Sequence, residues 1–250
     1  KIRDPNVEKI RIVCISDTHN EHGSLEVPPG DILLHAGDFT LNGTIDEVLR
    51  FNAWLGTQPH QHKIVVAGNH DYIMDEAFYE RQWRDVHKKQ GKQRLHGASP
   101  RSLLTNCTYL ENQSVEIEGF KIYGSPYSLH IPKHHEMAFG LREREADQFQ
   151  TDTASRAWAD IPSDTDILIT HTPPYGIKDK LVLGKRVGCK DLRASVEELN
   201  PLLHVFGHIH EDYGIIESET GRTIYANASM VTMLYTGKHK CLVVDLPLPR

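Results

Sequence analysis

Residues 10–19, Ile-Arg-Ile-Val-Cys-Ile-Ser-Asp-Thr-His, are the stretch of sequence that decides the fold. Residues 10–15 form a short run with the β-branched composition of a buried strand, and it leads directly into Asp17 and His19. A strand that is apolar on both faces is typical of a sheet covered by helices. Polar side chains that follow such a strand lie at the edge of the sheet where α/β proteins bind their ligands.

The same pattern recurs along the chain. Further strands are predicted at residues 32–34, 64–67, 120–123, 167–169, 202–206, 223–226 and 241–244. Helices are predicted between them, from Thr44 to a left-handed end at Gly56, from Asp75 to Gly91, and over residues 190–199. Thr44 and Glu47 have the spacing of a capping box, which marks the start of the first helix. Strands that alternate with helices predict an α/β protein with a layered sheet.

One domain is expected over residues 1–250, because no linker or internal repeat divides the sequence. Residues 127–150 fit the alternation worst, and we expect them to form a solvated insertion or lid. This segment contains His130, His134 and His135, for which a solvated loop is favoured over a metal-binding tract. The charged run at residues 142–145 is expected to be an exposed helix face.

The composition of the chain limits the kinds of molecule it can bind and the compartments in which it can function. The chain has 28 Lys and Arg against 34 Asp and Glu, a formal charge of −6, so long nucleic acid is not expected to bind. No apolar run approaches the roughly 20 residues of a membrane span. The 4 cysteines are far apart and there is no secretory signal, so a cytoplasmic location is expected. The oligomeric state is not predicted.

Five polar motifs follow five of the predicted strands. They are Ser-Asp-Thr-His at 16–19, His-Ala-Gly-Asp at 35–38, Gly-Asn-His-Asp at 68–71, Thr-His-Thr-Pro-Pro at 170–174 and Gly-His-Ile-His at 207–210. Because the carboxyl ends of strands in such a sheet border one crevice, we expect these separate segments to converge. Each motif alone is a weak signal, whereas five in order, all carrying Asp, Asn or His, predict a metal site.

The predicted ligands provide oxygen and nitrogen donors and no thiolate. They are Asp17, His19, Asp38, Asn69, His171, His208 and His210. A single tetrahedral zinc needs only four ligands, whereas seven with a shared carboxylate suit two divalent ions roughly 3.5–4 Å apart. The two aspartates cancel only part of the charge of two such ions, so the site is expected to attract phosphate. His35 and His204 lie inside apolar strands and are expected to be buried structural residues, and Asn227 either lines the crevice or forms a turn.

In this order, the five motifs resemble those of the calcineurin-like metallophosphoesterase superfamily. The surrounding sequence, such as Leu-His-Ala-Gly-Asp-Phe-Thr and His-Val-Phe-Gly-His-Ile-His, resembles its branch of animal metallophosphoesterase-domain proteins, which are phosphodiesterases. The resemblance implies a four-layer α/β/β/α sandwich with two central mixed sheets.

The resemblance also implies roles for the site residues. Asp17, His19 and His210 would hold the first ion, Asn69, His171 and His208 the second, and Asp38 would bridge both. His70 would bind no metal and would face the scissile phosphate. Catalysis is therefore expected to depend on Asp38, Asn69 and His70, with Asn69 and His70 also contacting the substrate. Manganese is the expected ion, and iron, zinc and cobalt are alternatives.

The predicted function is hydrolysis of a small phosphoester by a phosphodiesterase, with a cyclic nucleotide as substrate. Protein phosphatases of the superfamily continue the second motif as Gly-Asp-x-Val-Asp-Arg-Gly, whereas Phe-Thr-Leu-Asn-Gly follows Asp38 here, so a phosphoprotein substrate is not expected. A phosphomonoesterase, and a catalytically weak metal-binding scaffold on the same fold, remain open as alternatives.

Overall fold

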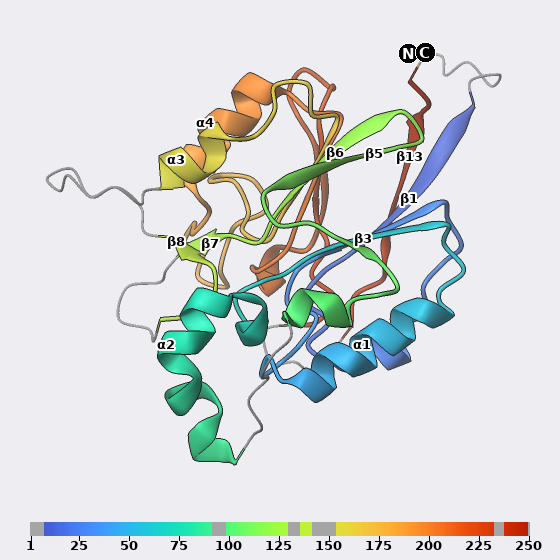
Figure 1. The fold of residues 1–250 in the computed structure, drawn as a ribbon. Coiled ribbons are helices and arrows are strands. Elements are labelled where there is room, and N and C mark those ends of the chain that lie inside the picture. Colours follow the sequence, from blue (N-terminus) through green and yellow to red (C-terminus); the bar gives the residue numbers. More distant parts are fainter. Residues whose placement is uncertain (1–7, 92–98, 130–135, 142–153, 233–237, 250) are drawn as a thin grey trace, which may run out of the picture.

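Two mixed β-sheets packed face to face form the centre of the computed structural model, which describes residues 8–91, 99–129, 136–141, 154–232 and 238–249 (Figure 1). The first sheet has the order β13-β1-β2-β3-β4, with bounds Leu242–Pro247, Lys9–Ile15, Ile32–Ala36, His62–Val66 and Thr108–Tyr109. The second has the order β11-β12-β10-β9-β6-β5, with bounds Gly214–Glu217, Ile224–Asn227, Leu203–Phe206, Ile167–Thr170, Phe120–Ser125 and Gln113–Ile117. Both sheets are mainly parallel, with β13, β11 and β5 antiparallel to their neighbours.

Helices cover the outer face of each sheet and complete four layers (Figure 1). The α-helices are α1 (Ile45–Thr57), α2 (Glu76–Val86), α3 (Ala154–Ala159) and α4 (Lys190–Leu199). Phe51 and Leu55 of α1 pack with Val65 of the first sheet, and Val196 of α4 packs with Leu168 of the second. A third core lies between the sheets and contains side chains from β1, β3, β6 and β10. The predicted α/β/β/α sandwich is therefore confirmed.

Two helix ends differ from the prediction. Gly56 lies inside α1, so the prediction that it ends this helix in the left-handed conformation is wrong. A Cβ there would lie 3.0 Å from the Asn106 side chain, so close packing explains this glycine. α2 stops at Val86, short of the predicted end at Gly91, and a separate 3-10 turn at Lys88–Gln90 leads to Gly91, whose φ is 70°.

Short elements without a clear periodicity complete the structure. The 3-10 turns are Glu21–Ser24, Tyr72–Met74, Lys88–Gln90, Pro100–Leu103 and His210–Asp212. In the predicted lid, β7 (Ser128–Leu129) pairs in parallel with β8 (Gly140–Leu141) as a small separate sheet. The three lid histidines at 130, 134 and 135 and the charged run at 142–145 lie outside the described residues, so the lid stays a prediction. The single domain over residues 1–250 also stays a prediction.

Two further observations concern membrane-spanning helices and the cysteines. Within the described ranges, no helix combines the length and the apolar character that crossing a membrane requires. The cysteines, at positions 14, 107, 189 and 241, are all free thiols.

The predicted capping box at the start of α1 is present, and its glutamate does more than cap the helix. Glu47 is 4% exposed, and its carboxylate accepts hydrogen bonds from the Thr44 backbone at 2.8 Å and from the Asn20 amide at 2.5 Å. It also accepts from the backbone N–H of Asn42. Glu47 therefore fixes both the loop that follows His19 and the loop that precedes α1. Burial favours the protonated form of Glu47, but these hydrogen bonds favour the carboxylate more strongly, so the pKa of Glu47 is lowered overall.

Replacing Glu47 by Gln is expected to lower the free energy of unfolding by about 1–3 kcal/mol at pH 7, because an amide N–H₂ would face donors that now bind a carboxylate. The lowered pKa means that this stabilisation is present above the unfolded pKa of about 4.3 and is lost as the pH falls through the folded value. Urea unfolding at pH 7 and pH 4 measures both effects. Asp46→Asn, an exposed change in the same helical turn, is the control, and equal destabilisation by both variants would contradict the assignment.

Candidate metal centre

The five motifs meet where β1, β2, β3, β9 and β10 end, so strand ends from both sheets contribute to one site. Asp17, Asp38 and His171 are at most 2% exposed there. The backbone at four of the predicted ligands has positive φ: 50° at Asp17, 40° at His19, 56° at Asp38 and 67° at His208. Such conformations are unfavourable for these residues and persist where the surrounding structure enforces them, most often at functional sites.

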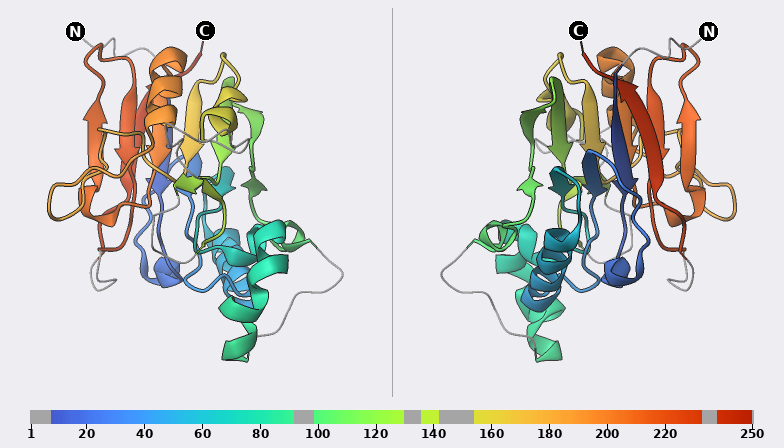
Figure 2. Two further views of the ribbon diagram at one scale, coloured as in Figure 1. Left: turned by 90° about the vertical axis from the view of Figure 1, so that its left-hand side faces the viewer. Right: turned by 90° about the vertical axis from the view of Figure 1, so that its right-hand side faces the viewer.

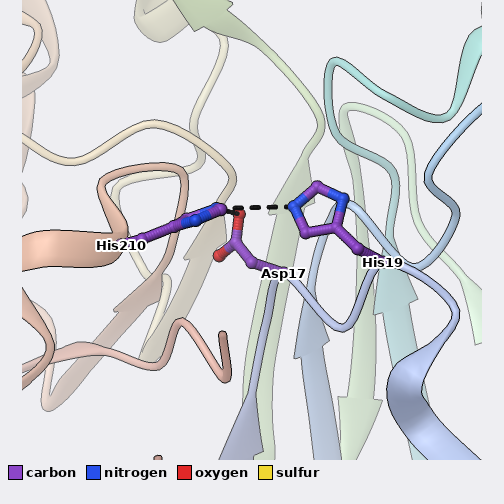
Figure 3. A group of neighbouring side chains, drawn as sticks. All are labelled: Asp17, His19 and His210. Carbon is purple, nitrogen blue, oxygen red and sulfur yellow. Dashed lines mark hydrogen bonds and ion pairs between the residues drawn. The ribbon is translucent and has the colours of Figure 1, made fainter. Parts of the chain in front are cut away.

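One group of ligand atoms belongs to Asp17, His19 and His210, whose side chains point toward one another from two segments, the loop after β1 and the loop after β10 (Figure 3). The Asp17 carboxylate lies 3.3 Å from Nε2 of His210, and Nε2 of His19 lies 3.4 Å from the same nitrogen. One donor atom from each residue lies within 4.8 Å of the other two, as ligands of a single ion require. The structure thus brings together the residues predicted for the first ion.

A second group belongs to Asp38, His171 and His208. Oδ2 of Asp38 lies 3.4 Å from Nε2 of His171 and 3.7 Å from Nε2 of His19, so this carboxylate reaches histidines of both groups. Oδ1 of Asn69 lies 2.9 Å from Nε2 of His171 and therefore borders the second group. The seven predicted ligands are close together, with Asp38 between the two groups as a bridging role needs.

Backbone carbonyls orient two of the histidines. Nδ1 of His19 donates to the carbonyl of Thr40 at 3.2 Å, and Nδ1 of His171 donates to that of Ala36 at 2.9 Å. Because a carbonyl can only accept, Nδ1 carries the proton and Nε2 is left to bind an ion. This arrangement is usual for histidines that coordinate metals.

The electrostatics of the site favour ligation of cations. Burial lowers the pKa of His19 to about 4 and that of His208 to about 3, so both imidazoles are neutral at pH 7. Burial also opposes protonation of His171, but the Asp38 carboxylate outweighs it and raises the pKa to about 9, so a bound cation would take the place of the proton on Nε2 of His171. Burial raises the pKa of Asp38, whereas the surrounding imidazoles outweigh it and hold this pKa well below the ordinary value. An ionised carboxylate among imidazoles, with a carboxamide oxygen beside them, fits divalent cations.

His70 lies at the rim of the site. A ring nitrogen of His70 groups with donor atoms of His19 and Asp38, and its ring makes an edge contact with His19 at 4.8 Å between centroids. Its Nδ1 donates to the carbonyl of Leu41 at 2.9 Å, and its backbone N–H donates to Oδ1 of Asp38 at 2.7 Å. Distance alone would allow His70 to be a metal ligand, so its predicted catalytic role remains a proposal.

Asp71 is a structural residue of the site to which the sequence analysis gave no role. Its buried carboxylate accepts from the backbone N–H groups of Gly68 at 2.8 Å, Asp38 at 2.9 Å and Thr40 at 2.9 Å. It also accepts from the Thr40 hydroxyl at 2.6 Å. Burial and the nearby Asp38 carboxylate raise the pKa of Asp71, against the effect of these donors. Asp71 thus joins the loops after β2 and β3, and its place at the end of a polar motif was the available signal.

Asn227 and Ser229 support the opposite side of the site. The Asn227 amide donates to the carbonyls of Lys178 and Ile209, which fixes the loop carrying His210. The Ser229 hydroxyl lies 2.8 Å from Oδ2 of Asp17 and orients this carboxylate. Asn227 is therefore a buried brace rather than a residue that lines the crevice.

The prediction for His35 and His204 is confirmed. Both are fully buried, and Nε2 of each is hydrogen-bonded to a threonine hydroxyl, that of Thr18 at 3.0 Å and that of Thr170 at 2.9 Å. Neither belongs to a group of candidate ligands among the described residues.

The chain belongs to the calcineurin-like phosphoesterase family, whose model matches residues 10–212. Human metallophosphoesterase domain-containing protein 1 is 42% identical to it over 246 residues, covering 96% of this chain and 72% of that protein. UPF0046 protein C25E10.12 of Caenorhabditis elegans is 38% identical over 248 residues, covering 96% of this chain and 82% of the relative. The crystal structure of TT1561 from Thermus thermophilus shares the fold, with a TM-score of 0.56, 14% identity and coverage of 97% and 100% of the two chains.

Family membership confirms the resemblance seen in the motifs. It implies a hydrolase of phosphoesters with a metal centre, and the grouped Asp and His side chains agree with a binuclear site. The identity of the ions and of the ester is a separate question.

Ser229→Ala is expected to weaken binding of one divalent ion by about 10–100-fold, because residues that orient a metal ligand typically contribute this much. The ion at Asp17, His19 and His210 should be the one affected. Calorimetric titration with Mn²⁺ measures the change, and circular dichroism shows whether the fold is retained. Ser102→Ala, an exposed change in another part of the chain, is the control. Unchanged affinities for both ions would contradict the role given to Ser229.

Proposed function

We propose that this chain is a binuclear metal-dependent phosphodiesterase that hydrolyses a small phosphoester, with a cyclic nucleotide as the substrate. The observation that carries the proposal is the position of Asp38, whose carboxylate lies within 3.7 Å of histidines from two groups of candidate ligands. Two ions that share a carboxylate are the arrangement of two-metal phosphoester hydrolases. The formal charge of −6 and the absence of an arginine in the residues that directly follow Asp38 favour a small ester over nucleic acid or a phosphoprotein.

In this proposal each site residue has a defined role. Asp17, His19 and His210 would hold one ion, Asn69, His171 and His208 would hold the other, and Asp38 would bind both. When bound, the ions supply a hydroxide nucleophile at neutral pH and a positive field for the phosphate oxygens. Manganese is proposed, with iron, zinc or cobalt as alternatives, because Asp, Asn and His ligands accept all of them.

Asn69 is suited to contact the phosphate as well as an ion. Its Oδ1 faces His171 at 2.9 Å, while its Nδ2 donates to the sulfur of Met137 at 3.4 Å. A thioether is a weak acceptor, so a phosphate oxygen can replace it at little cost. The amide N–H would then stabilise negative charge on the phosphate.

His70 is proposed to hold the proton that the leaving oxygen takes up. Its Nδ1–H is bound to the carbonyl of Leu41, which leaves Nε2 to donate when the imidazole is protonated. The ring is half-buried beside His19, at the border between the two groups of candidate ligands and solvent. A general acid in this position would protonate the alkoxide as the bond to phosphorus breaks.

The alternative functions use the same residues and are separated by experiment. A phosphomonoesterase needs the same ions, so hydrolysis rates for cyclic nucleotides, linear diesters and monoesters decide between the two after loading with Mn²⁺. A scaffold without catalysis would hydrolyse none of these esters. The cytoplasmic location stays a prediction.

The protein is expected to bind two divalent ions per chain, and chelation should abolish hydrolysis. Asp38→Asn removes a charge shared by both ions and should weaken both sites, whereas His208→Gly should weaken chiefly the second. Elemental analysis and calorimetric titration of freshly loaded protein measure the ion content. Saturation at one ion per chain would refute the binuclear site, and identical losses in the two variants would refute the division of the ligands.

His70→Asn should leave two ions bound but lower kcat by about 10²–10⁴-fold for a nucleotide ester, whose alkoxide needs a proton to leave. A p-nitrophenyl ester should be affected less, because its phenolate leaves without a proton. Both esters are measured on wild type and variant, with metal content determined in parallel. Equal losses for the two esters would show that His70 positions the phosphate instead, and loss of an ion would show that it is a ligand.

A further inference from the structure

We infer that the loop between β9 and α4 is a docking surface for an anionic lipid bilayer. Val182 and Leu183 form its tip and are 69% and 96% exposed. Leu183 is the most exposed large apolar side chain among the described residues. Figure 2 shows this loop projecting beyond β11, the edge strand of the second sheet. Apolar side chains at the end of a projecting loop are in a position to enter a bilayer, where their burial is favourable.

The loop is braced internally, so its shape persists without a partner. The backbone N–H of Leu181 donates to the carbonyl of Lys185 at 2.9 Å, and the backbone N–H of Gly184 donates to the carbonyl of Leu181 at 2.7 Å. Below the tip, the fully buried carboxylate of Asp179 accepts from Nη1 of Arg186 at 2.6 Å and from the backbone N–H of Gly188 at 3.1 Å. A loop that is already ordered loses little conformational entropy when it binds.

Cationic and aromatic side chains surround the apolar tip. Lys180 and Lys185 are exposed on either side of it, within a chain whose formal charge is −6. Lys190 lies 5.5 Å from the centre of the Tyr175 ring, which is 39% exposed at the base of the loop. Lysines attract anionic headgroups, and tyrosine favours the boundary between lipid and water. The charges therefore select an anionic surface.

A bilayer suits this surface better than a protein partner does. Stable protein interfaces bury about 800 Å² on each side, which a projecting tip of two apolar residues cannot provide. Binding to a membrane instead combines a small inserted apolar tip with lysines that remain at the headgroups. The convex shape and the composition of the loop agree with this second mode.

Docking here would bring the metal centre close to the bilayer. The loop begins at the predicted ligand His171, and the backbone N–H of Lys180 donates to the carboxylate of Asp212, two residues after His210, at 2.9 Å. The loop thus borders the site, while its apolar tip at Val182 and Leu183 contributes no candidate ligand. The inference uses the site only for this location and does not depend on the proposed phosphodiesterase activity.

Co-sedimentation of the metal-loaded full chain with vesicles tests the inference. Wild type should bind vesicles of phosphatidylcholine with phosphatidylserine and not vesicles of phosphatidylcholine alone, and raising the salt should weaken binding. Leu183→Asp should reduce binding by at least about tenfold, because an inserted leucine contributes that much or more. Leu49→Asp is the matched control, since Leu49 is 45% exposed on α1, which packs against the first sheet.

Three results would overturn the inference. Wild type could remain unbound in the presence of phosphatidylserine, or Leu183→Asp could bind as tightly as wild type. Sedimentation velocity could also show that Leu183→Asp dissociates an oligomer, which would assign the surface to a second copy of this chain. Hydrolysis of a soluble ester by the same variants is measured separately, so failure of docking is distinguished from failure of the proposed activity.

Discussion

The arrangement of the site depends on the buried carboxylate of Asp38. Its Oδ1 accepts from the backbone N–H of His70, and its Oδ2 lies near imidazoles that follow β1 and β9. Its own backbone N–H donates to Asp71, and its carbonyl accepts from the backbone N–H of His19. Segments from both sheets therefore contact one residue. An ionised carboxylate that is buried this deeply needs such partners, since an unpaired buried charge is strongly destabilising.

The close approach of the strand ends places a steric demand on the glycines between them. A Cβ at Gly207 would collide with Asp17 and Ser16, and a Cβ at Gly68 would collide with Asp38. Any other residue would push a carboxylate out of its position. The glycines in these two motifs are therefore required by packing against ligands, and Gly207 needs no unusual φ for this role. This steric demand explains why glycine precedes His208 and Asn69.

Local patterns in the sequence were sufficient to predict an α/β protein, the main strands and the convergence of the motifs, whereas the four-layer arrangement with two sheets was implied by the family resemblance. Apolar runs define the strands, and a ligand directly after a strand must lie at the edge of the sheet. The role of Asp71 could not be predicted, since its donors come from Gly68, Asp38 and Thr40 in two separate loops. β4, with only two residues, has no periodicity to detect. Gly56 was misread because its packing partner, Asn106, is fifty residues away in the sequence.

The orientation of the Asn69 amide follows from the chemistry of its two neighbours. The sulfur of Met137 can only accept, so the amide nitrogen faces it and the oxygen faces the ligands of the second group. A stronger acceptor than a thioether would hold the nitrogen more firmly and compete with a phosphate oxygen. An aliphatic side chain at position 137 would offer no acceptor and would leave the orientation of the Asn69 amide undetermined. A methionine beside Asn69 therefore fixes the amide while leaving its N–H groups available for exchange to a charged ligand.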